Sequence, residues 1–373
     1  MVRSEPFVSI IVVNFNGTQW LKECFQSLEQ LRYPRDCFEV IMGDNASTDH
    51  SVEWTRQNFP GIKIIQFDKN YGFCKANNLC AQQAKGEYIA FLNNDAFVTP
   101  DWLGNLVKAA QSDPNVKLCA SKIFFPHLKE GRVLNAAGGI FLISGLGLDI
   151  GFLEDDSAQY GIQNYTAFGC GAGILVQRDF FINTGGFDEY LFHSSEDADF
   201  AYRVWLYGYK VLYVPSAVMY HYLGRTISSG KGIAPLMFFL ITRNSIYFIL
   251  KNYEWSTAIK GLLLLKARIF FRIFYSLFTG NANVLKMAIR GYFFALRDIR
   301  RTLKIRRLTQ AHRRISDSEL VRSGILTGAW QTLKLTLGRE KKLEQYGVRE
   351  VYDKSGKAQI HIDEKGEFSF YQS

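Results

Sequence analysis

The chain has 373 residues, of which 47% are hydrophobic and 15% are aromatic, and its formal net charge is +9. This composition can build a large apolar core, which excludes a globally disordered chain. The length exceeds that of one average core, so we expect a main domain followed by an appendage.

The positive charge is concentrated in one late segment. From Lys251 to Arg314 the chain has 15 Lys or Arg against two Asp or Glu, a net +13, which leaves −4 for the remainder. The same segment is rich in Phe, Leu and Ile, a character that suits a lipid surface better than nucleic acid. We therefore predict a membrane partner and no nucleic-acid partner.

The cysteines and the N-terminal residues indicate the compartment. The six cysteines form no C-x-x-C pair, which favours free thiols in a reducing compartment. Residues 1–6 are polar and contain no signal-peptide core, and no 18-residue stretch is both apolar and uncharged. We expect a cytoplasmic protein that associates peripherally with the inner face of the cell membrane.

Strand and helix patterns alternate over the first part of the chain. Short apolar runs predict strands, and 3.6-residue periodicity predicts helices. Repeated βα units indicate a parallel sheet with helices on both faces and ligands at the carboxyl ends of its strands. The predicted strands are Phe7–Val13, Phe38–Met42, Ile62–Phe67 and Tyr88–Leu92, and the predicted helices are Gly17–Gln30, Asp49–Asn58, Phe73–Ala84 and one that starts near Pro100.

The second part of the pattern is less regular. Further strands are predicted at Val116–Phe125, Ala172–Val176 and Lys210–Val214, with a helix beginning near Glu196. Residues 126–168 are rich in glycine and are interpreted as irregular loops.

From Pro235 onward, helices rich in Phe, Leu and Ile with interspersed Lys and Arg are predicted at Leu236–Leu250, Thr257–Phe278 and Val284–Leu303. This is the composition of helices that lie in a membrane interface, although an ordinary helical subdomain with a basic face has the same composition. Residues 316–373 are polar, and Ile360–Tyr371 alternates around Glu-Lys-Gly as a small hairpin would. The expected domains are residues 1–234, 235–315 and 316–373.

Acidic residues follow two of the predicted strands. Asp44 comes directly after the second strand, where its carboxylate can accept a hydrogen bond from a pyrimidine N–H. Capping of the next helix explains Asp49, but it does not explain Asp44. Asp95, preceded by Asn93 and Asn94, follows the fourth strand and suits a hard cation such as Mg²⁺ or Mn²⁺. A polar turn that merely ends a strand is the alternative for this second group.

Two further groups have the chemistry of a catalytic site. Glu196, Asp197 and Asp199 place three acids in four residues; Glu196 and Asp199 share a helix face, whereas Asp197 points elsewhere. One of them could be a general base, although acids are also common at helix starts. His221 follows the predicted strand Lys210–Val214 and a turn at Pro215, and it is a candidate metal ligand or a structural histidine.

One glycine-rich motif is excluded as a dinucleotide loop. Gly169-Cys170-Gly171-Ala172-Gly173 lacks the last glycine of G-x-G-x-x-G, and it precedes a strand instead of following one.

Taken together, the motifs from about Phe7 to Tyr253 resemble those of the family 2 glycosyltransferases, in particular the rhamnosyltransferase-like branch. This resemblance implies an α/β fold of the GT-A type, a mostly parallel sheet flanked by helices, followed by C-terminal amphipathic helices. The motifs begin at Ser9–Gly17, Asp44–Asp49, Asn70–Phe73 with Asn77-Asn78, and Leu92–Asp95. They continue at Gly185–Glu189, Ser195–Phe200 with Arg203, Gly208-Tyr209, His221, Arg243-Asn244 and Lys251–Tyr253.

The resemblance assigns roles to individual residues. Asp197 matches the catalytic base of the family, with Glu196 as the second choice. Asp95 matches the metal-binding acid of an Asp-x-Asp motif whose first acid is here Asn93, and His221 would be a second ligand for Mg²⁺ or Mn²⁺. The nucleotide-sugar would be bound by Val13, Asn14, Asn16, Asp44, Asn45, Ser47, Asn70, Gly72, Phe73, Asn77, Asn93 and Asn94.

The implied activity is inverting transfer of one sugar, rhamnose being the first choice, from a dTDP- or UDP-sugar to a lipid-linked or glycan acceptor in surface polysaccharide or cell-wall assembly. The alternatives are a non-catalytic nucleotide-sugar-binding scaffold at the membrane, a nucleotidyltransferase and a processive synthase. The last two lack their expected signals here, a basic Gly-rich loop after the first strand and a Gln-x-x-Arg-Trp motif. The basic segment could also mediate a homodimer.

Overall fold

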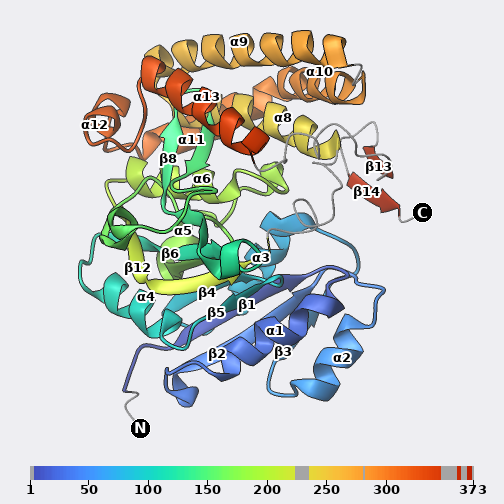
Figure 1. The fold of residues 1–373 in the computed structure, drawn as a ribbon, viewed down its shortest axis with the longest axis vertical. Helices are drawn as coiled ribbons and strands as arrows, with labels where there is room; N and C mark the ends of the chain where they lie inside the picture. Colours follow the sequence, from blue (N-terminus) through green and yellow to red (C-terminus); the bar gives the residue numbers. More distant parts are fainter. Residues whose placement is uncertain (1–3, 223–234, 280–281, 346–358, 363–367, 372–373) are drawn as a thin grey trace. The chain divides into compact units, whose positions relative to one another are not determined.

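The computed structural model describes residues 4–222, 235–279, 282–345, 359–362 and 368–371 (Figure 1). The chain divides into two compact units. The first comprises residues 1–141 and 147–222, and the second comprises residues 142–146 and 223–373. All predicted site residues belong to the first unit.

The first unit begins with the predicted alternation of strands and helices. Four parallel strands pair in the order β3-β2-β1-β4, with one helix after each of the first three. These elements are β1 (Val8–Asn14), α1 (Thr18–Glu29), β2 (Phe38–Asp44), α2 (Ser51–Asn58), β3 (Lys63–Gln66), α3 (Gly72–Gln82) and β4 (Tyr88–Asn93). The prediction of parallel βα units is confirmed over this half.

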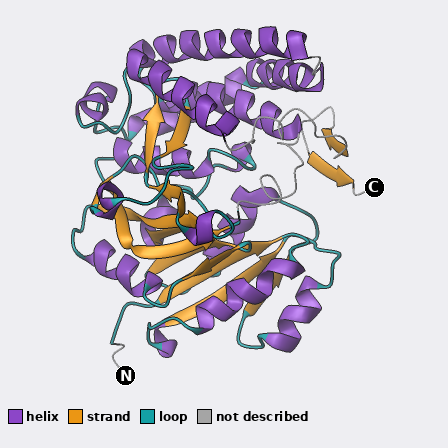
Figure 2. Cartoon of the chain, viewed as in Figure 1, coloured by secondary structure: helices purple, strands orange, loops and turns teal. Residues whose placement is uncertain are grey.

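The other half of the sheet mixes strand directions, which the sequence did not predict. β11 lies antiparallel between β4 and β6, while β12 runs parallel to β6. The elements are β5 (Ala96–Val98), α4 (Trp102–Gln111), β6 (Val116–Phe125), β11 (Gly173–Gln177), α5 (Arg178–Asn183), α6 (Glu196–Leu206) and β12 (Lys210–His221). Figure 2 shows the strands side by side with helices packed around them.

Two expectations about this half are wrong. Residues 126–168 are not all irregular, because they contain β7 (Val133–Ala137), β8 (Gly139–Leu142), β9 (Leu146–Asp149) and β10 (Asn164–Tyr165). β12 does not end before Pro215 but continues to His221 through a register shift between Val214 and Val218. A bulge needs no regular ladder hydrogen bond, so it accommodates the proline within the strand.

The core forms because β1 is buried on both faces. Val8, Ile10 and Val12 point into one apolar cluster with side chains of α1 and α4, and Ile11, on the opposite face, is also fully buried. Side chains alternate between the faces of a strand, so a continuous apolar run marks a strand covered on both sides. The sheet is thereby held rigidly, with its polar strand ends at one edge.

The second unit is helical. The predicted helix Val284–Leu303 is two helices, which meet at Asp298. The helices are α8 (Pro235–Asn252), α9 (Trp255–Thr279), α10 (Ala282–Arg297), α11 (Ile299–Ala311), α12 (Asp317–Arg322) and α13 (Ala329–Gln345). β13 (Gln359–Ile362) and β14 (Phe368–Tyr371) pair antiparallel, as predicted for a hairpin, whereas its Glu-Lys-Gly turn lies outside the described residues. Among the described residues, no helix is long and apolar enough to cross a membrane.

Candidate active site

The carboxyl ends of β1, β2 and β4 form one polar edge of the sheet. Asn14 ends β1 opposite Asp44 at the end of β2, and Val13 pairs with Asn93 at the end of β4. The buried Asn14 amide joins both sides: its Nδ2 donates to Asp44 Oδ1 over 3.2 Å, and its Oδ1 accepts from Asn94 Nδ2 over 2.8 Å. The residues predicted after three separate strands therefore meet.

The loop after β2 is organised by Asp44 and Ser47. Asp44 Oδ2 accepts from the backbone N–H of Ser47 over 3.0 Å, and Ser47 Oγ accepts from Asn14 Nδ2 over 3.1 Å. The backbone N–H of Asn16 also donates to Ser47 Oγ, over 2.9 Å, and Asn16 Oδ1 accepts from Thr48 N–H over 2.7 Å. Asp44 thus holds this loop, and each of its oxygens keeps a further lone pair for another donor.

Asp49 connects the first two helices, beyond the capping role that its position predicts. Its Oδ1 accepts from the backbone N–H of Ser51 in α2 over 3.2 Å, and its Oδ2 accepts from Thr18 N–H at the start of α1 over 2.9 Å. Burial by itself raises the pKa of Asp49, but the hydrogen bonds from Ser51 and Thr18 outweigh it and lower the pKa.

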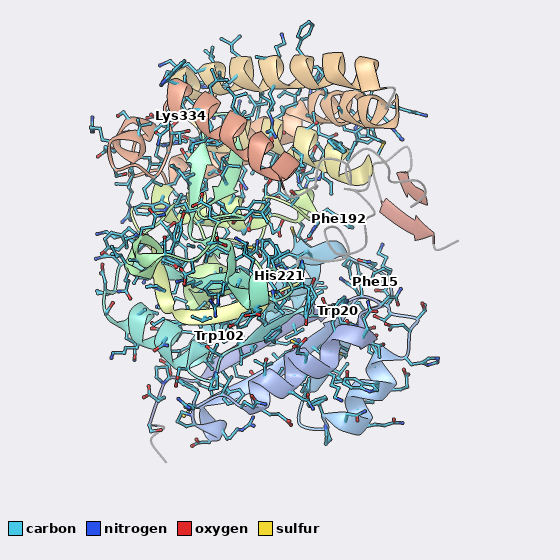
Figure 3. The ribbon with its side chains drawn as sticks, viewed as in Figure 1. Phe15, Trp20, Trp102, Phe192, His221 and Lys334 are labelled. Carbon is cyan, nitrogen blue, oxygen red and sulfur yellow. The ribbon has the colours of Figure 1, made fainter. Side chains whose placement is uncertain are left out.

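Asn45 and Asn70 shape the entry into α3. Asn45 Oδ1 accepts from the backbone N–H of Tyr71 over 3.1 Å, and Asn70 Oδ1 accepts from Gly72 N–H over 2.8 Å. Gly72 has φ +74°, and an added Cβ would lie 2.5 Å from the ring of Phe192, which is labelled in Figure 3. Only glycine fits this backbone conformation and this approach together.

The segment after Gly72 is tied to the chain that precedes α6. The backbone N–H of Phe73 donates to the carbonyl oxygen of Phe192 over 3.0 Å. Asn77 Nδ2 donates to the Phe73 carbonyl over 2.9 Å, and Asn78 exchanges hydrogen bonds with both backbone groups of Phe187, over 2.8 and 2.9 Å. The amides of Asn77 and Asn78 therefore bind backbone groups in this structure and position α3.

Asp95 and His221 meet at the end of β4. Nε2 of His221, labelled in Figure 3, is 3.2 Å from Asp95 Oδ1 and 3.2 Å from Asn93 Nδ2, and Asp95 and His221 are almost fully buried. On its other side, His221 Nδ1 lies 2.9 Å from Oδ1 of the buried Asn135 in β7. Sequence reasoning missed Asn135, which falls in the segment interpreted as loops.

The donor set of this arrangement fits a divalent metal. An amide oxygen can only accept, so Asn135 Oδ1 accepts a hydrogen bond from Nδ1–H, and Nε2 faces the Asp95 carboxylate. An imidazole nitrogen and a carboxylate oxygen are both groups that divalent metals accept as ligands. Among the described residues, no group of three or more His, Cys, Asp or Glu could hold a metal. Asp95 and His221 can hold one together with diphosphate oxygens, in the way Mg²⁺ takes few protein ligands and more from phosphate.

The acidic motif lies at the start of α6. Asp197 Oδ2 accepts from the backbone N–H of Gly171 over 2.9 Å. The carbonyl oxygen of Ala172, the residue after Gly171, accepts from the backbone N–H of Asn93 over 3.0 Å. The excluded glycine motif is therefore a loop that ties the acidic motif to the end of β4, a role that no sequence signal predicted.

The three acids differ in environment. Asp199 is fully buried and forms an ion pair with Arg203 over 3.2 Å, which makes it structural. Glu196 is buried, and its Oε2 has no hydrogen-bond partner within the described part of the chain. Burial and the neighbouring Asp197 raise the pKa of Glu196 to about 8, and burial also raises the pKa of Asp197. Two carboxyl groups with raised pKa values in a polar site are typical of acid–base chemistry.

The amino-acid sequence matches the model of Glycosyl transferase family 2 over residues 9–178. Among curated proteins, the O-antigen biosynthesis protein RfbC of Myxococcus xanthus is 30% identical over 233 residues, which is 59% of this chain and 18% of that protein. Glycosyltransferase AglE of Haloferax volcanii is 28% identical over 134 residues, 35% of this chain and 44% of that protein. The chain spans less than half the length of these relatives.

Solved structures share the fold at low identity. Residues 1–349 of Staphylococcus aureus TarS in complex with UDP superpose with a TM-score of 0.51 at 17% identity, covering 98% of this chain and 96% of that one. GalNAc-T7 with UDP, GalNAc and Mn²⁺ gives 0.55 at 18% identity over 70% of this chain and 50% of that one. These neighbours are GT-A glycosyltransferases. Residues 9–178 therefore match glycosyl transferase family 2, and the fold of the chain is that of GT-A glycosyltransferases.

Proposed function

We propose that the chain is a metal-dependent, inverting glycosyltransferase that moves one sugar from a nucleoside diphosphate sugar to an acceptor hydroxyl. The observation that carries the proposal is the convergence of Asn14, Asp44, Asp95 and His221 at one edge of the sheet, beside a loop that also binds Asp197. A nucleotide, a metal-bound diphosphate and a general base are needed together for this chemistry.

On the donor side, Asp44 accepts the N–H of a pyrimidine base through its remaining lone pairs. Val13, Asn14, Asn16, Asn45 and Ser47 line the nucleotide, and Asn70, Gly72, Phe73 and Asn77 shape the wall around it. Asp95 and His221 hold Mg²⁺ or Mn²⁺, with Asn93 and Asn94 beside them. The metal supplies positive charge that stabilises the leaving diphosphate.

On the acceptor side, Asp197 removes the proton of the attacking hydroxyl. The acceptor oxygen then forms its bond to the anomeric carbon while the bond from that carbon to the diphosphate oxygen breaks on the opposite face. This single displacement inverts the configuration and forms no sugar–enzyme bond. Glu196 is the second candidate for this role. It comes second because its raised pKa favours the protonated form, which cannot accept a proton.

For the substrates, we propose dTDP-rhamnose as the first donor to test, followed by UDP-hexoses and UDP-N-acetylhexosamines. The resemblance of the motifs to the rhamnosyltransferase-like branch supports this order. The acceptor would be a lipid-linked saccharide of surface polysaccharide assembly, as the name of the O-antigen relative suggests. The protein would work on the cytoplasmic face of the cell membrane, as a monomer or a homodimer.

The test is release of nucleoside diphosphate from a panel of dTDP-, UDP- and GDP-sugars, with and without Mn²⁺, combined with thermal unfolding under the same conditions. Metal-dependent stabilisation and turnover with one nucleotide would support the proposal, since a ligand at about 100 times its Kd adds about 2.7 kcal/mol of stability. Metal-dependent binding without turnover on any supplied acceptor would favour the non-catalytic scaffold. No binding of any nucleotide would overturn both.

A further inference from the structure

Helix α9 is apolar on two opposite faces. On one face Ala258, Gly261 and Leu265 are buried against the rest of the second unit, to which α9 belongs. An added Cβ at Gly261 would lie 2.3 Å from the carbonyl oxygen of Ile143, so this face packs backbone to backbone. A helix needs only one apolar face to pack on its own protein.

The opposite face of α9 exposes large apolar side chains. Trp255, Ile259, Leu263 and Phe270 are 54%, 58%, 62% and 71% exposed. Their spacing of four, four and seven residues places them on one face of the helix. We call these four residues the α9 stripe. Figure 3 shows side chains projecting outward from α9.

The charge on α9 is of one sign. The helix carries four basic residues and no acidic residue. At helical spacing the exposed Lys266 falls within the α9 stripe and the exposed Lys260 lies beside Leu263, so both long side chains can reach lipid phosphates while the apolar side chains lie deeper. An apolar stripe that also carries lysines complements a surface that is apolar below a negatively charged layer.

Helix α10, which contacts α9, repeats the pattern. Ile289, Tyr292, Phe293 and Leu296 are exposed at helical spacing, and the exposed Lys286 and Arg297 lie beside them. α10 also has no acidic residue. Two adjacent helices with this arrangement offer a broader face than an incidental exposed side chain would.

We propose that the α9 stripe, extended by the exposed face of α10, binds an anionic phospholipid surface, with the helices lying in the interface. The proposal gives the membrane association of the proposed function its contact surface, and it does not depend on the transfer chemistry. The α9 stripe and its lysines complement anionic headgroups over acyl chains, which selects a bilayer over a second copy of the chain, because a second copy would bring two basic faces together.

The test is flotation of the full chain with vesicles of phosphatidylcholine containing 30% phosphatidylglycerol, against vesicles of phosphatidylcholine alone. The wild type should float with the anionic vesicles, and less so at high salt. The double variant Ile259→Ser/Leu263→Ser should lose about tenfold or more in partitioning, because both side chains are expected to enter the interface. Ile162→Ser in the first unit, where Ile162 is 62% exposed, is the matched control and should float as the wild type does.

A second variant, Lys260→Glu/Lys266→Glu, separates charge from burial. It should reduce binding to anionic vesicles and leave the unfolding temperature unchanged, since both lysines are exposed. Equal flotation of wild type and both double variants would overturn the proposal. So would loss of a dimer in the serine variant, seen by light scattering, with vesicle binding intact. Nucleotide release measured on a water-soluble acceptor without vesicles reports on the transferase proposal separately.

Discussion

Oδ1 of Asn135 and Nδ1 of His221 lie 2.9 Å apart, and this contact anchors an imidazole ring whose other nitrogen, Nε2, faces Asp95. An acceptor on Nδ1 directs the lone pair of Nε2 toward the carboxylate. A histidine on β12 and an asparagine on β7 are thus coupled to an acid at the end of β4.

Replacing Asn135 by leucine should weaken metal binding. The substitution removes the acceptor at similar volume, so the ring is free to take the other tautomer, and the affinity for Mn²⁺ should fall about 10- to 100-fold. The measurement is Mn²⁺ titration by electron paramagnetic resonance in the presence of the nucleoside diphosphate. Asn135→Asp keeps an acceptor at Nδ1 and should retain most of the affinity. Unchanged Mn²⁺ binding in the leucine variant would show that Asn135 does not position a ligand.

Asp197→Asn should separate turnover from donor binding. The amide oxygen can still accept from Gly171, but the amide cannot take a proton, so turnover should fall about 10²- to 10⁴-fold. Single-turnover kinetics and calorimetric titration with the donor would measure the two effects. Asp179→Asn, at an exposed acid in α5, is the control and should change neither. An equal loss of donor affinity and turnover in Asp197→Asn would contradict the role of general base.

Glu196 should make the protein less stable as pH rises. Its pKa is raised to about 8 in the fold, so between about pH 4.5, the usual pKa, and 8 the native state holds a proton that the unfolded state releases. The stabilising contribution is complete below pH 4.5 and is lost as pH rises through 8, at up to about 1.4 kcal/mol per pH unit.

Glu196→Gln imitates the protonated carboxyl group and should flatten this dependence. Thermal unfolding from pH 5 to 8.5 should show the variant gaining on the wild type as pH increases. Parallel curves for the two proteins would mean that the Glu196 carboxylate is compensated in the folded state.

The strand–helix alternation up to β4 was predictable because each element depends on its own residues. The continuous apolar runs of β1 and β4 mark strands that are buried on both faces, whichever strands pair with them. They could therefore be predicted without knowing the order of the sheet. Asp44 and Asp95 could be found as site candidates for the same reason, since they follow such runs directly. Their hydrogen bonds to the loop after β2 and to His221 require the folded sheet.

The strands between residues 126 and 168 could not be predicted from the sequence, because these short strands are stabilised by pairing with strands distant in the chain. β7 pairs with β6, and the two residues of β10 pair with β12. The strand preference of such segments comes from these neighbours more than from their own residues. Asn135 was hidden for this reason. The division between α10 and α11 was also invisible, because Asp298 accepts from Thr302 N–H as a helical residue would.

Arg306 of α11 caps the C-terminal end of α8. The family motif at Lys251–Tyr253 did not predict this contact. Arg306 is buried, and its Nη1 donates to the carbonyl oxygens of Leu250 and Tyr253 over 2.7 and 2.6 Å. Its guanidinium also lies 4.0 Å from the ring centre of Trp255. The last carbonyl groups of a helix have no partner within the helix, so this arginine supplies it.

Arg306→Met should destabilise the second unit by about 3 kcal/mol, because it keeps the length of the side chain and leaves two carbonyl groups without their donor. Arg307→Met, at the exposed neighbouring position, is the matched control and should stay within about 0.5 kcal/mol of the wild type. Guanidinium unfolding followed by circular dichroism measures both. Equal stability of the two variants would mean that other donors, such as Gln310, which binds the carbonyls of Lys251 and Asn252, suffice to cap α8.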